Sequence, residues 1–236
     1  MTRFGSSVLI TVALWALFVL AACSAFLPAQ KQFAQPTTAV AHTPLANPPQ
    51  AAIAVYATQA NGMPADNVLV YAQPLDAHAV RVDDPPAVLN ILDRHFQPAL
   101  LPVHEGGTVT VQNLDGVAHD VYSFSQVRPL SLHLAPGERE TGLRFPHAGV
   151  VAVGCKIYNE MQGYIYVTDA PYFGTTDLNG YLRLGDLPTG RYRIGVWSHA
   201  IPAKGFPGFP LVVTLKAGPD EVVRIRIRKS RAVGTL

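Results

Sequence analysis

Short runs of alternating apolar and polar residues recur between turn signals, whereas no apolar repeat of helical length stands out. The clearest run is Val223 to Arg228, where aliphatic residues alternate strictly with arginines. A period of two places successive side chains on opposite faces of a strand, whereas a helix needs a period near 3.6. Twenty prolines and nineteen glycines spread along the chain supply many turns. The sequence therefore predicts an all-β protein, built as a sandwich or a barrel.

Turn residues divide the predicted strands into three series. The first series is predicted to be a hairpin, in which Ile53 to Tyr56 and Val68 to Tyr71 flank the turn at Asn61-Gly62. The middle series comprises Val88 to Leu92, Gly107 to Val111, Val121 to Phe124, Leu130 to Leu134, Leu143 to Phe145, Val150 to Val153 and Gly163 to Val167. The last series comprises Tyr181 to Leu184, Tyr192 to Trp197 and the alternating run. The arginines of that run form either a solvated edge that discourages aggregation or a surface for anionic headgroups.

Charge and motif content exclude several functional classes. With Lys+Arg 18 against Asp+Glu 16, the chain lacks the basic footprint of a nucleic-acid-binding protein. The sequence contains no Ser-His-Asp arrangement, no phosphate-cradling glycine loop, no paired carboxylates and no zinc-ligand spacing. We therefore expect a binding protein rather than an enzyme.

The N-terminus has the layout of an export signal. A basic start is followed by an apolar run and small residues, which is too short for a typical membrane span. The sequence Leu-Ala-Ala-Cys that ends at Cys23 resembles the bacterial lipoprotein box. The resemblance implies that residues 1–23 are a lipoprotein-type signal segment, cut before Cys23, and that Cys23 is lipidated and becomes the first residue of the mature chain. The alternative is an ordinary signal peptide cut near Ala22 or Ala25. Residues 24–50, rich in Ala and Pro, are predicted to be a disordered tether. We expect a membrane-anchored periplasmic lipoprotein with an unknown redox or envelope partner.

The most specific pattern lies in the centre of the chain. An Asn-containing strand leads to His119, and a later strand ends at Cys155 in a loop that places Tyr158 and Met161 at spacings of three. This pattern resembles the cupredoxin family of plastocyanin- and amicyanin-like blue copper proteins. The flanking segments are in particular similar to bacterial proteins often labelled methylamine utilization proteins: Val121 to Ser125, Val167 to Asp169 and Pro171 to Phe173. The resemblance implies a Greek-key barrel in which His119 is the strand ligand, Cys155 the thiolate and Met161 the axial ligand.

Position 158 departs from the family pattern, which has the second histidine ligand there. A phenol is a poor ligand at neutral pH unless a metal displaces its proton. The remaining nitrogen, thiolate and thioether donors form a soft set that suits Cu(I) better than a Cu(I)/Cu(II) shuttle. The site is therefore expected to be a degenerate type 1 copper site with Tyr158 at a degenerate ligand position. Its functions would be copper binding or electron transfer, and the alternative is a metal-free envelope scaffold that keeps the fold.

Other histidines are not expected to replace the missing ligand. His147 lies eight residues before Cys155 on an extended segment, so we place it at the opposite end of the barrel. The remaining candidates are expected to lie on the surface or outside the motif: His95, His104, His133 and His199.

The last strand series resembles a second kind of module. Residues 175–197 are similar to carboxypeptidase regulatory-like (transthyretin-like) sandwiches, in which a hairpin normally comes directly before the Asp-x-x-Gly turn. Here about a hundred residues intervene between that hairpin and the turn at Asp177. We therefore expect residues 86–169 to form the cupredoxin-like domain, inserted into a discontinuous sandwich of residues 51–82 and 170–230. The alternative is three units in a row.

Overall fold

The computed structural model describes residues 50–76, 86–200 and 209–227. The expected signal peptide, Cys23 and almost all of the expected tether lie outside these residues. The described parts consist of strands, turns and bends without a helix, so the predicted all-β class is confirmed. In these parts of the chain, no helix has the length and hydropathy needed to cross a membrane.

The described residues contain sixteen strands. They are β1 (Gln50–Gln59), β2 (Leu69–Pro74), β3 (Ala87–Leu92), β4 (His95–Gln97), β5 (Leu100–His104), β6 (Thr108–Asn113), β7 (His119–Ser123), β8 (Leu130–Leu134), β9 (Arg139–Arg144), β10 (Gly149–Cys155), β11 (Gln162–Thr168), β12 (Tyr172–Thr175), β13 (Tyr181–Pro188), β14 (Gly190–Trp197), β15 (Leu211–Leu215) and β16 (Glu221–Ile227).

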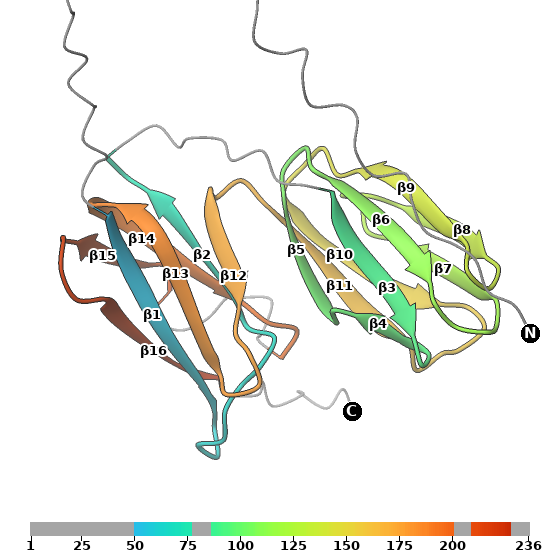
Figure 1. Ribbon diagram of the computed structural model, residues 1–236, viewed down its shortest axis with the longest axis horizontal. Coiled ribbons are helices and arrows are strands. Elements are labelled where there is room, and N and C mark those ends of the chain that lie inside the picture. Colours follow the sequence, from blue (N-terminus) through green and yellow to red (C-terminus); the bar gives the residue numbers. More distant parts are fainter. Residues whose placement is uncertain (1–49, 77–85, 201–208, 228–236) are drawn as a thin grey trace, which may run out of the picture. The chain divides into compact units, whose positions relative to one another are not determined.

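Two sheets combine strands from both ends of the described chain, with orders β13-β1-β16 and β12-β2-β14-β15 (Figure 1). Strand β1 pairs antiparallel with β13 and parallel with β16. The predicted hairpin of β1 with β2 is therefore wrong, because these strands belong to different sheets. Buried aliphatic side chains from both sheets, such as Ile53 and Ile194, form a common core. Burying these two apolar faces against each other explains why consecutive strands separate instead of pairing.

Strand β16 shows how alternation sets the two faces of a sheet. Val223, Ile225 and Ile227 are buried, whereas Arg224 and Arg226 are exposed. The strand lies at the edge of its sheet, where charged side chains oppose pairing with another chain. The third arginine of the predicted run, Arg228, lies outside the described residues.

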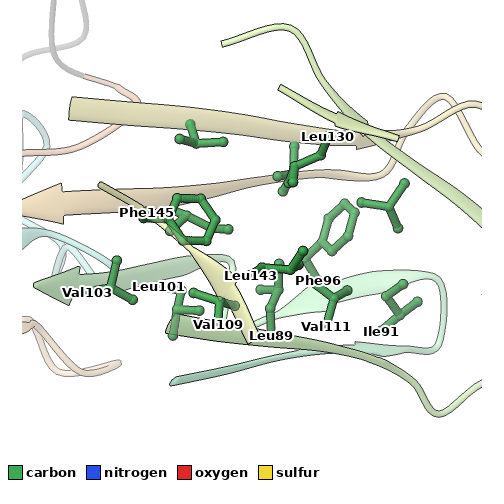
Figure 2. Close-up of a cluster of buried hydrophobic side chains, with 14 of the residues drawn as sticks. Leu89, Ile91, Phe96, Leu101, Val103, Val109, Val111, Leu130, Leu143 and Phe145 are labelled. Atoms are coloured by element: carbon green, nitrogen blue, oxygen red, sulfur yellow. The ribbon is translucent and has the colours of Figure 1, made fainter. Parts of the chain in front are cut away.

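The other two sheets have the orders β5-β11-β10-β7-β8 and β4-β3-β6-β9. Their inward side chains form a second apolar core in which Phe145 is fully buried, and Figure 2 shows aliphatic and aromatic side chains converging on it. Strands β4 and β5 had not been predicted, because β4 has only three residues and Pro102 interrupts β5. Pro102 lies within β5, which is tolerated because β5 is an edge strand.

Candidate metal centre

Two adjacent strands bring a thiol and an imidazole together. His119 is the first residue of β7, Cys155 is the last residue of β10, and Cys155 pairs with Val121 across the antiparallel ladder. Because His119 and Val121 are two residues apart, their side chains share the inward face. The Sγ atom of Cys155 consequently lies 3.7 Å from Nδ1 of His119. Both side chains are shielded from solvent, with 2% of Cys155 and 0% of His119 exposed.

The loop from Cys155 to Met161 turns every third side chain inward. Cys155 and Met161 are buried, Tyr158 is half-buried, and the four intervening residues are exposed. A backbone hydrogen bond from the Met161 N–H to the Tyr158 carbonyl, 3.1 Å long, closes the turn between them. Cys155 and Met161 belong to the same buried cluster, against which Tyr158 packs. The spacing of three in the sequence thus corresponds to a shared direction in the structure.

Tyr158 lies directly beside His119. The centroids of their rings are 5.2 Å apart, with an angle of 50° between the ring planes. On another side of Tyr158, the guanidinium carbon of Arg94 lies 4.7 Å from the centre of the phenol ring, which is a cation–π contact. The structure therefore brings His119 into contact with Cys155 and Tyr158, and it buries Met161, the fourth predicted site residue, in the same apolar cluster as Cys155.

Asp115 fixes the orientation of the His119 ring. Its Oδ2 atom lies 2.8 Å from Nε2 of His119, so an ionised carboxylate accepts a hydrogen bond from the Nε2–H group, and the unprotonated Nδ1 faces the thiol. Burial raises the pKa of Asp115, but hydrogen bonds from the Arg94 and Asp93 backbone N–H groups and from His119 outweigh burial. The net pKa lies below its ordinary value. The carboxylate is therefore ionised at neutral pH and selects one imidazole tautomer.

A buried asparagine shapes the loop that carries Asp115. Asn113 is fully buried, and its side-chain nitrogen lies 2.8–3.0 Å from three backbone carbonyl oxygens, those of Val117, Leu134 and Ala135. Its side-chain oxygen accepts a hydrogen bond from the Asp115 N–H at 2.9 Å. These bonds connect the loop to the end of β8, which holds Asp115 in reach of His119.

The other histidines lie elsewhere in the described structure. His95, His133 and His147 are exposed; His95 bonds to the Asp93 carbonyl, and His133 bonds to Asp120. The ring of His104 contacts Phe173, and the exposed ring of His199 stacks on Tyr164. Each of the last two therefore has an aromatic neighbour of its own.

Asp115 and Arg94 were not predicted to belong to the site. An acidic residue four positions before a histidine was a signal for Asp115, since carboxylates commonly orient metal-binding imidazoles. No comparable sequence signal marked Arg94, because its position depends on the pairing of β3 with β4.

The distance between the Cys155 thiol and Nδ1 of His119 is compatible with both atoms binding one metal ion. Bonds of roughly 2.0 Å to nitrogen and 2.3 Å to sulfur, at an angle of about 110–120°, place the nitrogen and sulfur atoms roughly 3.5–3.7 Å apart. The observed 3.7 Å lies in this range and equally suits a hydrogen bond from the thiol. Within the described residues, no group of three or more His, Cys, Asp or Glu side chains could hold a metal. A metal here would therefore need a further donor such as the Met161 thioether.

No protein-family model and no curated protein matches the chain. Among solved structures, it is similar to the Cu-containing nitrite reductase of Thermus scotoductus SA-01, with 25% identity and a TM-score of 0.34 over 41% of this chain. That match spans only 25% of the reductase. A purple cupredoxin from Nitrosopumilus maritimus matches 35% of this chain and 99% of its own, with 24% identity and a TM-score of 0.31. A reduced Cu(I) form of amicyanin matches 42% of this chain and 99% of its own, with 23% identity and a TM-score of 0.33.

Proposed function

We propose that this chain is a cell-envelope, cupredoxin-like protein that binds copper, preferentially Cu(I), through His119, Cys155 and Met161. The observation that supports the proposal is the 3.7 Å separation between the thiol and the imidazole nitrogen, with the opposite nitrogen held by Asp115. A carboxylate that orients an imidazole from behind is a recurrent feature of metal sites. When bound, copper would supply one-electron chemistry or serve as cargo.

The donor set favours the monovalent ion. Thiolate and thioether are soft ligands that select Cu(I), whereas Cu(II) prefers additional nitrogen or oxygen donors in a tetragonal arrangement. Tyr158 occupies the loop position between Cys155 and Met161 and presents a phenol ring to His119 instead of a second imidazole. Rapid cycling between the two oxidation states would require a geometry that suits both, so copper carriage is favoured over electron transfer.

A metal-free scaffold is the second candidate, and the arrangement around Tyr158 supports it. The imidazole already has a hydrogen-bond partner at each nitrogen, and the phenol ring packs beside it. Both ring nitrogens of His119 have partners without a metal, so the fold does not require one.

Copper addition separates the two candidates. The purified chain, reduced and kept under anaerobic conditions, would be mixed with Cu(I), and the bound metal would be counted by native mass spectrometry. We expect wild type to retain a single copper ion, Cys155→Ser to lose it, and His133→Ala to behave like wild type because His133 is exposed. Wild type that binds no copper would support the scaffold.

Restoring the missing imidazole tests the placement of the loop. We expect Tyr158→His to bind Cu(II) with the intense visible charge-transfer band of a thiolate–copper bond, which wild type should lack. A colourless Tyr158→His protein with bound Cu(II) would mean that position 158 does not face the metal. Control spectra of Tyr158→His with Cys155→Ser would identify the thiolate as the source of the colour.

The envelope location rests on the sequence before residue 50. We propose that Cys23 carries the lipid anchor and that the partner is an envelope protein that delivers or receives copper. Metabolic labelling with palmitate should label wild type and not Cys23→Ser, whereas labelling of neither would indicate an ordinary signal peptide.

A further inference from the structure

The turn between β3 and β4 is held in an unusual backbone conformation next to the site. Asp93 and Arg94 have φ angles of 52° and 58°, in the left-handed region that non-glycine residues seldom adopt. The Asp115 carboxylate accepts hydrogen bonds from both backbone N–H groups, at 2.6 and 3.0 Å. The same carboxylate binds Nε2 of His119. One side chain therefore holds both the turn and the imidazole.

These contacts close into a ring. Asp115 binds His119, His119 lies against Tyr158, Tyr158 lies under the Arg94 guanidinium, and the Arg94 backbone returns to Asp115. Strained backbone persists where surrounding contacts over-determine it, and such positions cluster at functional sites. Here the strained turn directs a long cationic side chain onto the phenol ring.

Tyr158 is the loop residue that packs against the buried cluster containing Cys155 and Met161, with its ring beside His119. Between Cys155 and Met161 it is the one residue that is not exposed, and only 2% of Cys155 is exposed. A phenol ring that packs on one side against the imidazole and on another against Arg94 has little freedom to swing outward while both contacts last.

We propose that Tyr158, latched by Arg94, is a gate that determines which ligands and metal complexes reach Cys155 and His119, and that Asp115 couples the gate to the imidazole. Arg94 is thus a positioning residue that acts through Tyr158. The gate is expected to admit a small ion more readily than the bulky ligands that would accompany it. The consequence for copper rests on the proposed function, whereas the gate itself is measurable on metal-free protein.

The test is the rate of alkylation of Cys155 in the metal-free full chain, measured for a small reagent, iodoacetamide, and a bulky maleimide. Peptide-resolved mass spectrometry separates Cys155 from Cys23. We expect Arg94→Ala to react about three-fold faster than wild type, the factor that corresponds to an exposed cation–π contact. Tyr158→Ala should react at least about ten-fold faster, because local opening is no longer required. Both increases should be larger for the maleimide.

Matched variants make the result specific. Tyr158→Phe keeps the ring and Arg139→Ala removes an exposed arginine of β9, so both should react like wild type. Asp115→Asn should be accelerated like Arg94→Ala if the carboxylate couples the turn to the gate. Removing the positive charge of Arg94 would by itself disfavour the Cys155 thiolate and slow its alkylation. Faster alkylation of Arg94→Ala would therefore show that the reagent reaches the thiol more easily. Circular dichroism and thermal unfolding would verify that each variant is folded.

The outcomes are distinct. If Arg94→Ala reacts like wild type while Tyr158→Ala is faster, Arg94 is not the latch and the proposal fails. If neither variant is faster, Tyr158 is not a gate. If wild type binds no copper but the rates follow the expected order, the proposed function fails and the gate stands. In copper-loaded protein, Arg94→Ala should release Cu(I) to a chelator about three-fold faster than wild type does, by the same loss of contact.

Discussion

The Cys155 thiol and Nδ1 of His119 lie 3.7 Å apart although 36 positions separate them in the chain. Two antiparallel strands provide this proximity, and the Asp115 carboxylate determines which imidazole nitrogen faces the sulfur. The pair is buried, so its hydrogen bonding cannot be replaced by bulk water. We therefore expect the stability of the metal-free protein and the proposed copper binding to depend on the same two side chains.

Replacing the thiol should weaken the metal-free fold as well as metal binding. Cys155→Ala leaves the buried Nδ1 of His119 without its partner, and we expect a loss of about 1–3 kcal/mol in the free energy of unfolding. Denaturant titration of metal-free protein measures this loss. A variant as stable as wild type would mean that the contact contributes little energy.

Met161 either binds copper through its thioether or only fills the apolar core, and one substitution distinguishes these two roles. Met161→Leu conserves volume in the buried cluster, so we expect less than about 1.5 kcal/mol of destabilisation. If the thioether binds copper, Cu(I) affinity should fall about ten-fold, since a soft donor is lost. Competition with a Cu(I) chelator gives the affinity, and an unchanged affinity would assign Met161 to packing alone.

Sequence patterns predicted strands best where one face of a strand is buried. The strictly alternating run at β16 and the segment Leu130 to Leu134 appear as strands close to their predicted limits. Strands β4 and β12, with three and four residues, are too short to show a period. Pairing partners were harder to predict, because nothing local to β1 indicates that its neighbours lie more than a hundred residues away.

The site residues, like the strands, could be predicted from the sequence only where the signal was local. The family resemblance selected residues that the fold brings together, since the spacing of Cys155, Tyr158 and Met161 reflects one loop. Arg94 and the role of Asp115 depend on a turn from a different sheet and on a backbone conformation with positive φ. Such relations arise from tertiary packing and leave no periodic signal in the sequence.

Two phenylalanines that differ in burial form a matched pair for testing the packing of the core. Phe145 is fully buried in the second core, whereas 84% of Phe124 is exposed. We expect Phe145→Ala to cost about 3–5 kcal/mol through lost contacts and a cavity, and Phe124→Ala to stay within about 0.5 kcal/mol of wild type. Urea unfolding followed by circular dichroism measures both, and similar costs at the two positions would contradict the described packing.

Two glycines offer a second matched pair. A Cβ atom at Gly195 of β14 would overlap the ring of Tyr71, whereas one at Gly116 would meet no atom within 4 Å. We expect Gly195→Ala to destabilise the fold by about 1–3 kcal/mol through overpacking. Gly116→Ala should leave the thermal midpoint nearly unchanged. A neutral Gly195→Ala would show that Tyr71 can move aside.

An ion pair in the sheet of β2 and β14 predicts how stability depends on pH. Asp76 accepts hydrogen bonds from the side chain of Arg191, at 2.6 Å for Nη2, and from its backbone N–H, at 2.9 Å. The side-chain hydrogen bond, followed by the backbone one, lowers the pKa of Asp76 below its ordinary value. A carboxyl whose folded-state pKa is depressed contributes stability above its unfolded-state pKa of about 3.9, and that contribution is lost as pH falls through the folded-state pKa.

Asp76→Asn should therefore have a lower thermal midpoint than wild type at pH 7, and the difference should shrink once the pH falls below about 4. Both groups are exposed, so the difference should also decrease in high salt. Glu140→Gln, a change at an exposed carboxylate of β9, serves as the control that accounts for the loss of one negative charge. A difference between Asp76→Asn and wild type that persisted unchanged at low pH would show that the ion pair does not cause it.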